Sequence, residues 1–224
     1  MKLRTFTSLI FLILLTGTVH AATTFPLAVR IFIGQTNISP KNLNNELALQ
    51  GIKTVDAISQ LGIEATQPIN KELDWGLRYS RKYVKNDEQP DNSLTAYNAT
   101  IDQDAILILT RYAYFKQEAL RADVFIGVGG SNTSYKIKSA TQDGELSKKE
   151  VNDWVASPFA AAGLSVGVGH KNFYFTVEGG YEYNKVDSFK RTGTINANVD
   201  TLDLSGSYFK IGLMFDGLSG SSGK

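Results

Sequence analysis

The sequence predicts an all-β protein, an eight-stranded antiparallel up-and-down β-barrel that crosses a membrane. Three observations lead to this fold class. Apolar and polar residues alternate with a period of two along eight segments. After residue 21 no stretch reaches the ~18 consecutive apolar residues of a spanning helix. The connections between segments are alternately long and short, which an up-and-down membrane barrel requires and a Greek-key sandwich does not.

The first 21 residues have the features of a secretory signal peptide. Lys2 and Arg4 form a basic start, residues 8–15 form an apolar run, and Val19-His20-Ala21 is a small-residue cleavage site. The apolar run is much shorter than the ~20 residues of a membrane anchor. We therefore expect residues 1–21 to be removed on export and residues 22–224 to form one barrel domain.

The amino-acid composition argues against several classes of function. Without residues 1–21 the chain keeps 21 of its 23 Lys and Arg residues and all 22 Asp and Glu residues, so its net charge is about −1. This balance gives no basis for a nucleic-acid partner. The chain has no cysteine, which excludes disulfides and thiolate chemistry. The chain contains 10 Tyr, 12 Phe and 20 Gly residues, and it is therefore rich in residue types that form and bend strands.

The first four segments each have one apolar face and one face that carries charge. The alternation of apolar and polar residues is weakest in the second segment, and in the fourth both faces carry aliphatic residues. There Arg111 favours the phase that places Ile106, Ile108, Tyr112 and Tyr114 on the apolar face. The charged residues on the opposite faces are Arg30, Glu64, Asp74, Arg78 and Arg111. The segments span residues 26–34, 61–69, 73–84 and 104–115.

The last four segments keep the alternation, but their polar faces are rich in small residues. In residues 173–183 every odd position is apolar, aromatic or Gly. The charged residues on the polar faces of these segments are Asp123, Glu178, Glu182 and Lys210. The segments span residues 121–130, 157–170, 173–183 and 202–215.

The connections between the eight segments alternate in length. Short ones lie near residues 70–71, 116–120 and 171–172, and the long ones span roughly residues 36–60, 85–103, 139–156 and 188–200. The first long connection also has a partial helical stripe, broken at Gly51 and made by Leu43, Leu47, Ile52, Val55 and Ile58. We expect a short amphipathic helix here; the alternative is a hairpin extension of the flanking strands.

A membrane barrel turns its apolar faces to lipid and its polar faces to the lumen. The lumen of an eight-stranded barrel is just large enough for side chains to fill. We therefore expect the nine charged residues of the polar faces to pair with one another as a barrel-interior charge network. Tyr and Phe residues near the segment ends suit interfacial aromatic girdles. The alternative is a soluble barrel in which the apolar faces pack inward.

Several stretches carry a family resemblance. LTRYAYF (109–115) is followed by a short turn and VFIGVGG (124–130), and the last segment ends in YFKIGLMF (208–215). In layout and in these stretches the chain resembles the OmpA/OmpX-type eight-stranded outer-membrane β-barrels of Gram-negative bacteria. The resemblance implies short periplasmic turns, long extracellular loops, contact with outer-membrane lipids and a monomer. It also implies a C-terminal strand signal for the barrel-assembly machinery, carried by Lys210, Gly212 and Phe215, although the chain continues past Phe215.

The function implied by the resemblance is non-enzymatic. It is a structural or surface-interaction role in envelope integrity or adhesion, with an extracellular partner bound by the loops. Beyond residue 21 the only histidine is His170, at a short turn without an acid or nucleophile beside it, and the sequence indicates no cofactor or metal. Two alternatives stay open: a narrow ion channel or small-solute transporter, and a soluble periplasmic lipid-binding barrel.

Overall fold

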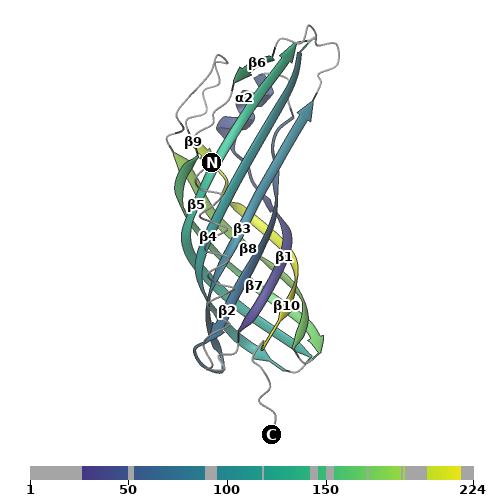
Figure 1. Ribbon diagram of the computed structural model, residues 1–224, viewed down its shortest axis with the longest axis vertical. Coiled ribbons are helices and arrows are strands. Elements are labelled where there is room, and N and C mark those ends of the chain that lie inside the picture. Colours follow the sequence, from purple (N-terminus) through teal and green to yellow (C-terminus); the bar gives the residue numbers. More distant parts are fainter. Residues whose placement is uncertain are drawn as a thin grey trace, which may run out of the picture.

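The structure is a computed structural model that forms one closed barrel with a sheet rising from one rim (Figure 1). It describes residues 27–49, 53–88, 95–117, 119–141, 146–149, 154–170, 172–187, 189 and 201–217. The predicted signal peptide lies outside these residues. The elements are β1 (Ala28–Asn37), α2 (Lys41–Leu49), β2 (Ala57–Pro68), β3 (Leu73–Glu88), β4 (Thr95–Lys116), β5 (Leu120–Thr141), β6 (Leu146–Lys149), β7 (Val155–His170), β8 (Phe173–Asp187), β9 (Thr201–Asp203) and β10 (Gly206–Phe215).

Eight antiparallel strands close the barrel in the order β1-β2-β3-β4-β5-β7-β8-β10. The seam is formed by β10, which pairs with β8 on one side and with β1 on the other. The remaining two strands are short: β6 pairs with β5, and β9 pairs with β8. The predicted eight-stranded up-and-down barrel is therefore confirmed.

The connections after β2, β4 and β7 are short and lie at one end, the short-turn rim (Figure 1). In the first of these turns the Asn70 Oδ1 accepts hydrogen bonds from the backbone N–H groups of Glu72 and Leu73, at 2.9 and 2.8 Å. Asparagine favours tight turns because its side chain can cap the backbone in this way. The start of β1 and the end of β10 lie at the same rim, since Val29 pairs with Phe215.

Side chains alternate between an apolar exterior and a polar interior. On β8, for example, Phe175 is 49% exposed whereas the next residue, Thr176, is 2% exposed. From Phe173 to Tyr183 the exterior of β8 is apolar apart from glycine. Ten steps of ~3.4 Å, tilted by about 45°, span about 24 Å, close to the ~25 Å apolar band of outer-membrane barrels. The alternative of a soluble barrel with its apolar faces inside is therefore wrong.

The phase chosen for the ambiguous fourth segment is confirmed. On β4, Ile106, Ile108, Tyr112 and Tyr114 are 45–60% exposed, and Arg111 is buried at 1%. None of the helical residues that the structure describes forms a segment long and apolar enough to cross a membrane.

Strands β3, β4 and β5 extend well beyond the apolar band, which corrects two predicted loops. Residues 85–103 were expected to form a long loop, but 85–88 and 95–103 are strand, with Glu88 opposite Tyr97. Within the predicted loop 139–156, residues 139–141, 146–149 and 155–156 are strand. In residues 95–103 the apolar positions Ala99 and Ile101 lie on the inner face, whereas Ile106 and Ile108 further along β4 lie on the outer face. The segment therefore does not continue the apolar exterior of the barrel, yet backbone pairing with neighbouring strands holds it extended. We call residues 81–88, 95–104 and 130–141 the protruding sheet.

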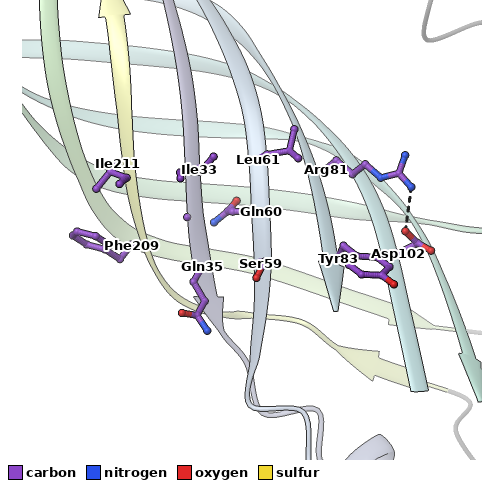
Figure 2. A pocket seen from close by; sticks show the side chains of 11 residues that line it. Ile33, Gln35, Ser59, Gln60, Leu61, Arg81, Tyr83, Asp102, Phe209 and Ile211 are labelled. Carbon is purple, nitrogen blue, oxygen red and sulfur yellow. Dashed lines mark hydrogen bonds and ion pairs between the residues drawn. The ribbon is translucent and has the colours of Figure 1, made fainter. Parts of the chain in front are cut away.

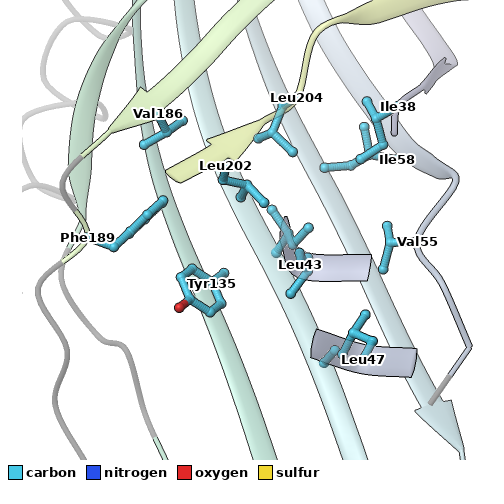
Figure 3. Close-up of a cluster of buried hydrophobic side chains, with 12 residues drawn as sticks. Ile38, Leu43, Leu47, Val55, Ile58, Tyr135, Val186, Phe189, Leu202 and Leu204 are labelled. Atoms are coloured by element: carbon cyan, nitrogen blue, oxygen red, sulfur yellow. The ribbon is translucent and has the colours of Figure 1, made fainter. Parts of the chain in front are cut away.

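The inner face of the protruding sheet is covered by α2 and by the chain around β9 (Figure 3). The expected helix is confirmed at Lys41–Leu49, but its stripe does not continue, because Ile58 belongs to β2. Gly51 and Ile52 lie outside the described residues. Asn44 fixes the helix by accepting the Val55 N–H at 2.8 Å and donating to the Val55 carbonyl at 3.2 Å. The buried side chains here, which we call the apolar cap, are Ile38, Leu43, Leu47, Val55, Ile58, Ala99, Ile101, Tyr135, Val186, Phe189, Leu202 and Leu204.

Candidate functional site

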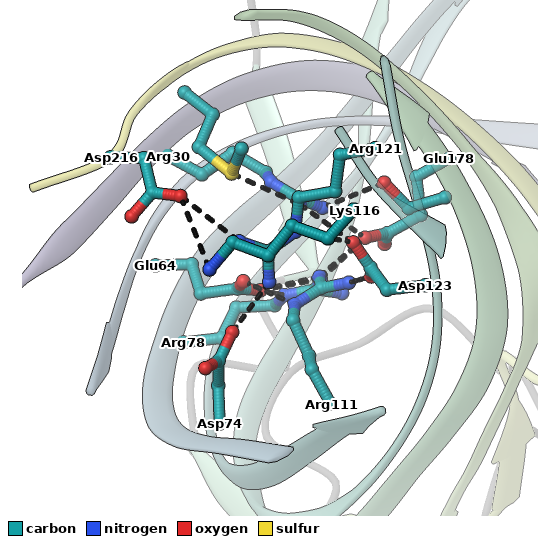
Figure 4. Close-up of polar contacts among 12 residues, drawn as sticks. Arg30, Glu64, Asp74, Arg78, Arg111, Lys116, Arg121, Asp123, Glu178 and Asp216 are labelled. Atoms are coloured by element: carbon teal, nitrogen blue, oxygen red, sulfur yellow. Dashed lines mark hydrogen bonds and ion pairs between the residues drawn. The ribbon is translucent and has the colours of Figure 1, made fainter. Parts of the chain in front are cut away.

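The nine charged residues expected in the lumen all lie inside the barrel, and none is more than 6% exposed. They come from seven of the eight barrel strands, every one except β7. Two further buried cations, Lys82 on β3 and Arg121 on β5, lie among them. We call these side chains the interior charge network: Arg30, Glu64, Asp74, Arg78, Lys82, Arg111, Arg121, Asp123, Glu178, Glu182 and Lys210. Figure 4 shows the part of the network around Arg111 and Arg121.

Glu178 on β8 is the meeting point of three guanidinium groups. Its Oε2 accepts hydrogen bonds from Arg30 Nη1 at 3.0 Å, Arg78 Nη2 at 2.8 Å and Arg111 Nη2 at 2.7 Å. The three donors come from β1, β3 and β4, so a single carboxylate connects three strands to a fourth. Hydrogen bonds between charged partners are among the stronger ones in proteins.

Glu64 on β2 makes a second junction beside the first. Its Oε1 accepts from Arg111 Nε at 2.6 Å, and its Oε2 accepts from Arg111 Nη2 at 2.9 Å and from Arg78 Nε at 2.7 Å. Arg111 also donates to Asp123 on β5. The planar fork of arginine can satisfy several carboxylates at once, which lysine cannot do with the same geometry.

Arg121 closes the network at the short-turn rim. Its Nη2 donates to Asp74 at 2.5 Å, its Nε to Asp123 at 3.3 Å and its Nη1 to Asp216 at 3.3 Å. Asp216 directly follows β10, and its side chain is 24% exposed. Lys116 lies 3.8 Å from the same carboxylate. The residue after the last strand therefore takes part in closing the lumen.

Toward the protruding sheet, two lysines share one carboxylate. Glu182 lies 2.5 Å from Lys82 Nζ and 2.9 Å from Lys210 Nζ, and it accepts the Thr36 hydroxyl at 3.0 Å. Lys210 Nζ is also 3.8 Å from Glu178, which links this group to the arginine junctions.

Aromatic rings fill the space between the charges. The Arg78 guanidinium lies 4.5 Å from the centre of the Phe125 ring, and Arg111 lies 4.6 Å from the same ring. Lys210 Nζ is 3.9 Å from the centre of the Tyr208 ring. A cation over an aromatic face is stabilised by the ring quadrupole. The lumen is therefore a packed core of ions and rings.

The charges of the interior nearly balance. The network holds six cations and five carboxylates, and Asp216 at the short-turn rim supplies a sixth carboxylate. Ions removed from water are tolerated only when they are paired and hydrogen-bonded. This balance explains how so many charges can share one lumen.

Lys82 and Arg121 could have been identified from the sequence. Each continues the phase of a strand already assigned: Lys82 lies four residues after Arg78, and Arg121 lies two residues before Asp123. Side chains two or four positions apart on a strand share a face. Alternation alone marks them weakly, because both fall at the edges of the segments that show it clearly.

Above the charges lie uncharged polar groups and then the apolar cap. Gln60 donates to Thr36 at 3.1 Å, and Gln103 donates to Thr133 at 2.8 Å and to Asn184 at 3.3 Å. From the short-turn rim outward, the interior therefore changes from ion pairs to amides and hydroxyls and then to aliphatic side chains. This order encloses the charges between the Asp216 closure and the apolar cap.

The remaining predicted positions lie at the barrel surface or seam. On β10, Lys210 points inward and Phe215 points outward at 39% exposure, with its ring 5.2 Å from that of Phe173. Gly212 pairs with Phe32 across the seam. His170 is the last residue of β7 and is exposed at the short-turn rim. Recognition of this strand by the assembly machinery stays a prediction.

Comparisons with known proteins give similar structures and no sequence relative. No protein-family model matches the chain, and no curated protein matches it. Ail of Yersinia pestis, solved with the heparin analogue sucrose octasulfate, is 12% identical with a TM-score of 0.49, over 87% of this chain and 99% of that one. The β-barrel domain of Pseudomonas aeruginosa OprF is 13% identical with a TM-score of 0.38, over 86% and 98%. The outer-membrane protease OmpT of Escherichia coli is 7% identical with a TM-score of 0.40, over 87% and 97%.

Proposed function

We propose that this protein is a barrel of the Gram-negative outer membrane that presents the protruding sheet to the cell exterior for surface contact, without catalysing a reaction. The observation that carries the proposal is the division of the molecule into two parts. One part is a barrel with an apolar band and a packed ionic interior. The other is a sheet that continues past this band and has an apolar core of its own.

The protruding sheet is suited to contact because it is held rigid at some distance from the bilayer. Strands β4 and β5 are each 22 residues long, about twice the ~9–11 residues that cross a membrane. Among the described residues, α2 and β9 pack against the inner face of the sheet and not against its outer face. A preorganised surface loses little conformational entropy when a partner binds.

The orientation follows from the connections. Outer-membrane barrels have short turns on the periplasmic side and longer loops outside. The short-turn rim is therefore assigned to the periplasm, and the protruding sheet to the exterior.

Adhesion of whole cells tests the proposal. Gram-negative cells that express the full chain should locate it in the outer membrane and adhere to epithelial monolayers more than cells with an empty vector. A Leu43→Asp/Leu47→Asp variant, which disrupts the apolar cap, should lose the added adhesion while keeping the barrel and its heat-dependent mobility on a denaturing gel. Equal adhesion by vector, wild-type and variant cells would overturn the contact role.

The channel alternative is less well supported, because paired side chains fill the lumen and the apolar cap covers it. Planar-bilayer recordings separate the two functions. We expect no steady conductance from wild-type protein. Ohmic single-channel steps that change size in Arg78→Glu would favour the channel.

A further inference from the structure

The exterior of the barrel carries a hollow that reaches the base of the protruding sheet, where Arg81, Tyr83 and Asp102 line it. Its volume is about 890 Å³, and it lies across strands β10, β1, β2, β3 and β4 (Figure 2). Ile33, Leu61 and Phe209 line it and are 56–59% exposed, so no described part of the chain covers it. We call it the lateral trough.

The half of the trough nearer the short-turn rim is aliphatic. Ile33 pairs with Ile211 on one side and with Leu61 on the other, which makes a continuous exterior row. The next row toward the short-turn rim, which contains Ile31 opposite Leu213, is also apolar. This half therefore lies in the hydrocarbon of the membrane, where acyl chains are its natural neighbours.

The other half combines aromatic walls with a polar floor. In this row Phe209 pairs with Gln35, Gln35 with Ser59, and Ser59 with Tyr83. Three strand spacings of ~4.8 Å place the two aromatic residues about 14 Å apart, with an amide and a hydroxyl between them. Aromatic rings at such a boundary can contact an apolar face while the polar groups beside them stay hydrated.

The charged side chains at the trough already have partners. Arg81 belongs to the aliphatic row but reaches outward to donate to Asp102 at 3.2 Å, as long cationic side chains do near an interface. Asp104, which pairs with Arg81 across the strands, accepts the Tyr79 hydroxyl at 2.6 Å. With one cation beside two carboxylates, the trough attracts a bare anion weakly. It still offers donors and acceptors to a ligand rich in hydroxyl groups.

We propose that the lateral trough binds a glycolipid of the outer leaflet. Its sugar headgroup would rest on Gln35 and Ser59 between the rings of Phe209 and Tyr83, and its acyl chains would lie along the aliphatic row. A sugar fits this surface because it combines hydroxyl groups with apolar ring faces. This inference goes beyond the contact function, since the ligand is a neighbour in the same membrane.

The experiment measures lipid retention by native mass spectrometry of detergent-extracted full-length protein. The probes are lipid A, an acylated and phosphorylated glucosamine disaccharide, and phosphatidylglycerol as a lipid without a sugar ring. Ser59→Trp fills the polar half of the trough. Ala162→Trp is the matched control, because Ala162 is exposed on β7, four strands away on the opposite wall.

We expect wild type and Ala162→Trp to retain lipid A equally, and Ser59→Trp to bind it about tenfold more weakly, as loss of a well-packed contact does. Should Ser59→Trp fail to fold, Phe209→Ala/Tyr83→Ala removes the walls without adding bulk and should weaken binding similarly. Equal retention by all folded variants would overturn the site. Retention of phosphatidylglycerol as strong as that of lipid A would overturn the claim that the trough recognises a sugar headgroup. Neither result depends on adhesion, so failure here is distinguishable from failure of the contact function.

Discussion

Replacing Glu178 by glutamine removes one negative charge from the point where three arginines meet. The variant keeps the size of the side chain and one carbonyl oxygen. It leaves Arg30, Arg78 and Arg111 with less negative charge around them in a lumen where each is at most 3% exposed. Two of the arginines keep Glu64, and Arg30 keeps the Ser165 hydroxyl at 3.1 Å.

The size of the effect follows from these contacts. Each of the three hydrogen bonds to the carboxylate contributes ~1.5–3 kcal/mol net. The glutamine oxygen and the remaining carboxylates recover part of this. We therefore expect Glu178→Gln to lower the free energy of unfolding by about 4 kcal/mol, within the ~3–5 kcal/mol lost when a buried pair is broken.

The assay is urea unfolding of the barrel in lipid vesicles, followed by the fluorescence of its two tryptophans. The control is Asp102→Asn, which breaks the exterior pair with Arg81, whose side chains are 44% and 21% exposed. It should cost less than ~1 kcal/mol, as exposed pairs do. A cost below 1 kcal/mol for Glu178→Gln, or equal costs for the two variants, would refute the reasoning.

Three further predictions follow from the packing. Glu182→Leu alone should lower the urea midpoint more than a triple variant in which Glu182, Lys82 and Lys210 are all replaced by apolar residues. The single variant leaves two buried cations without their shared carboxylate, and the opposite order would contradict the pairing. Leu47→Asp should destabilise the apolar cap by about 3 kcal/mol, which would appear as faster proteolysis within residues 38–56 than in the wild type. Equal cleavage rates in the two proteins would argue against a packed helix. Gly180→Ala places a methyl group against the backbone carbonyl oxygen of Ala162 and 2.6 Å from the Tyr208 hydroxyl. It should cost ~1–3 kcal/mol by overpacking, measured as a lower melting temperature; an unchanged melting temperature would mean that this wall is loosely packed.

The barrel was predictable because lipid and lumen impose opposite chemistry on alternate residues. On β8, Phe175 and Val177 contact the membrane while Thr176 and Glu178 face the lumen, so a period of two marks both the strand and its orientation. The alternation of short and long connections indicates that the apolar faces meet lipid and do not pack into the core of a soluble barrel.

The protruding sheet was missed for a physical reason. Beyond the apolar band the residues from Thr95 to Asp104 still alternate, but Ala99 and Ile101 point into the apolar cap. Ile106 and Ile108, in the barrel part of β4, instead point outward to lipid. The residues from Thr95 to Asp104 remain extended because β4 pairs with β3 and β5 along this length. Such pairing depends on register, which the sequence alone does not determine.

The interior could be predicted as a set of residues but not as a set of contacts. The phase of each strand indicates which charges point inward. Which of them meet depends on the stagger of strands far apart in sequence: Arg30 reaches Glu178 across 148 positions. Asp216 was missed because it lies just outside the last strand, where no alternation marks it.

The most direct test of the account is to measure which face of a strand meets lipid. The chain contains no cysteine, so single spin labels can be placed on β8 through Phe175→Cys, Thr176→Cys and Val177→Cys. Oxygen dissolved in the bilayer should relax the labels at 175 and 177 strongly and the label at 176 weakly. Weak relaxation at 175 and 177, with strong relaxation at 176, would mean that the apolar face lies inside and would contradict the membrane barrel.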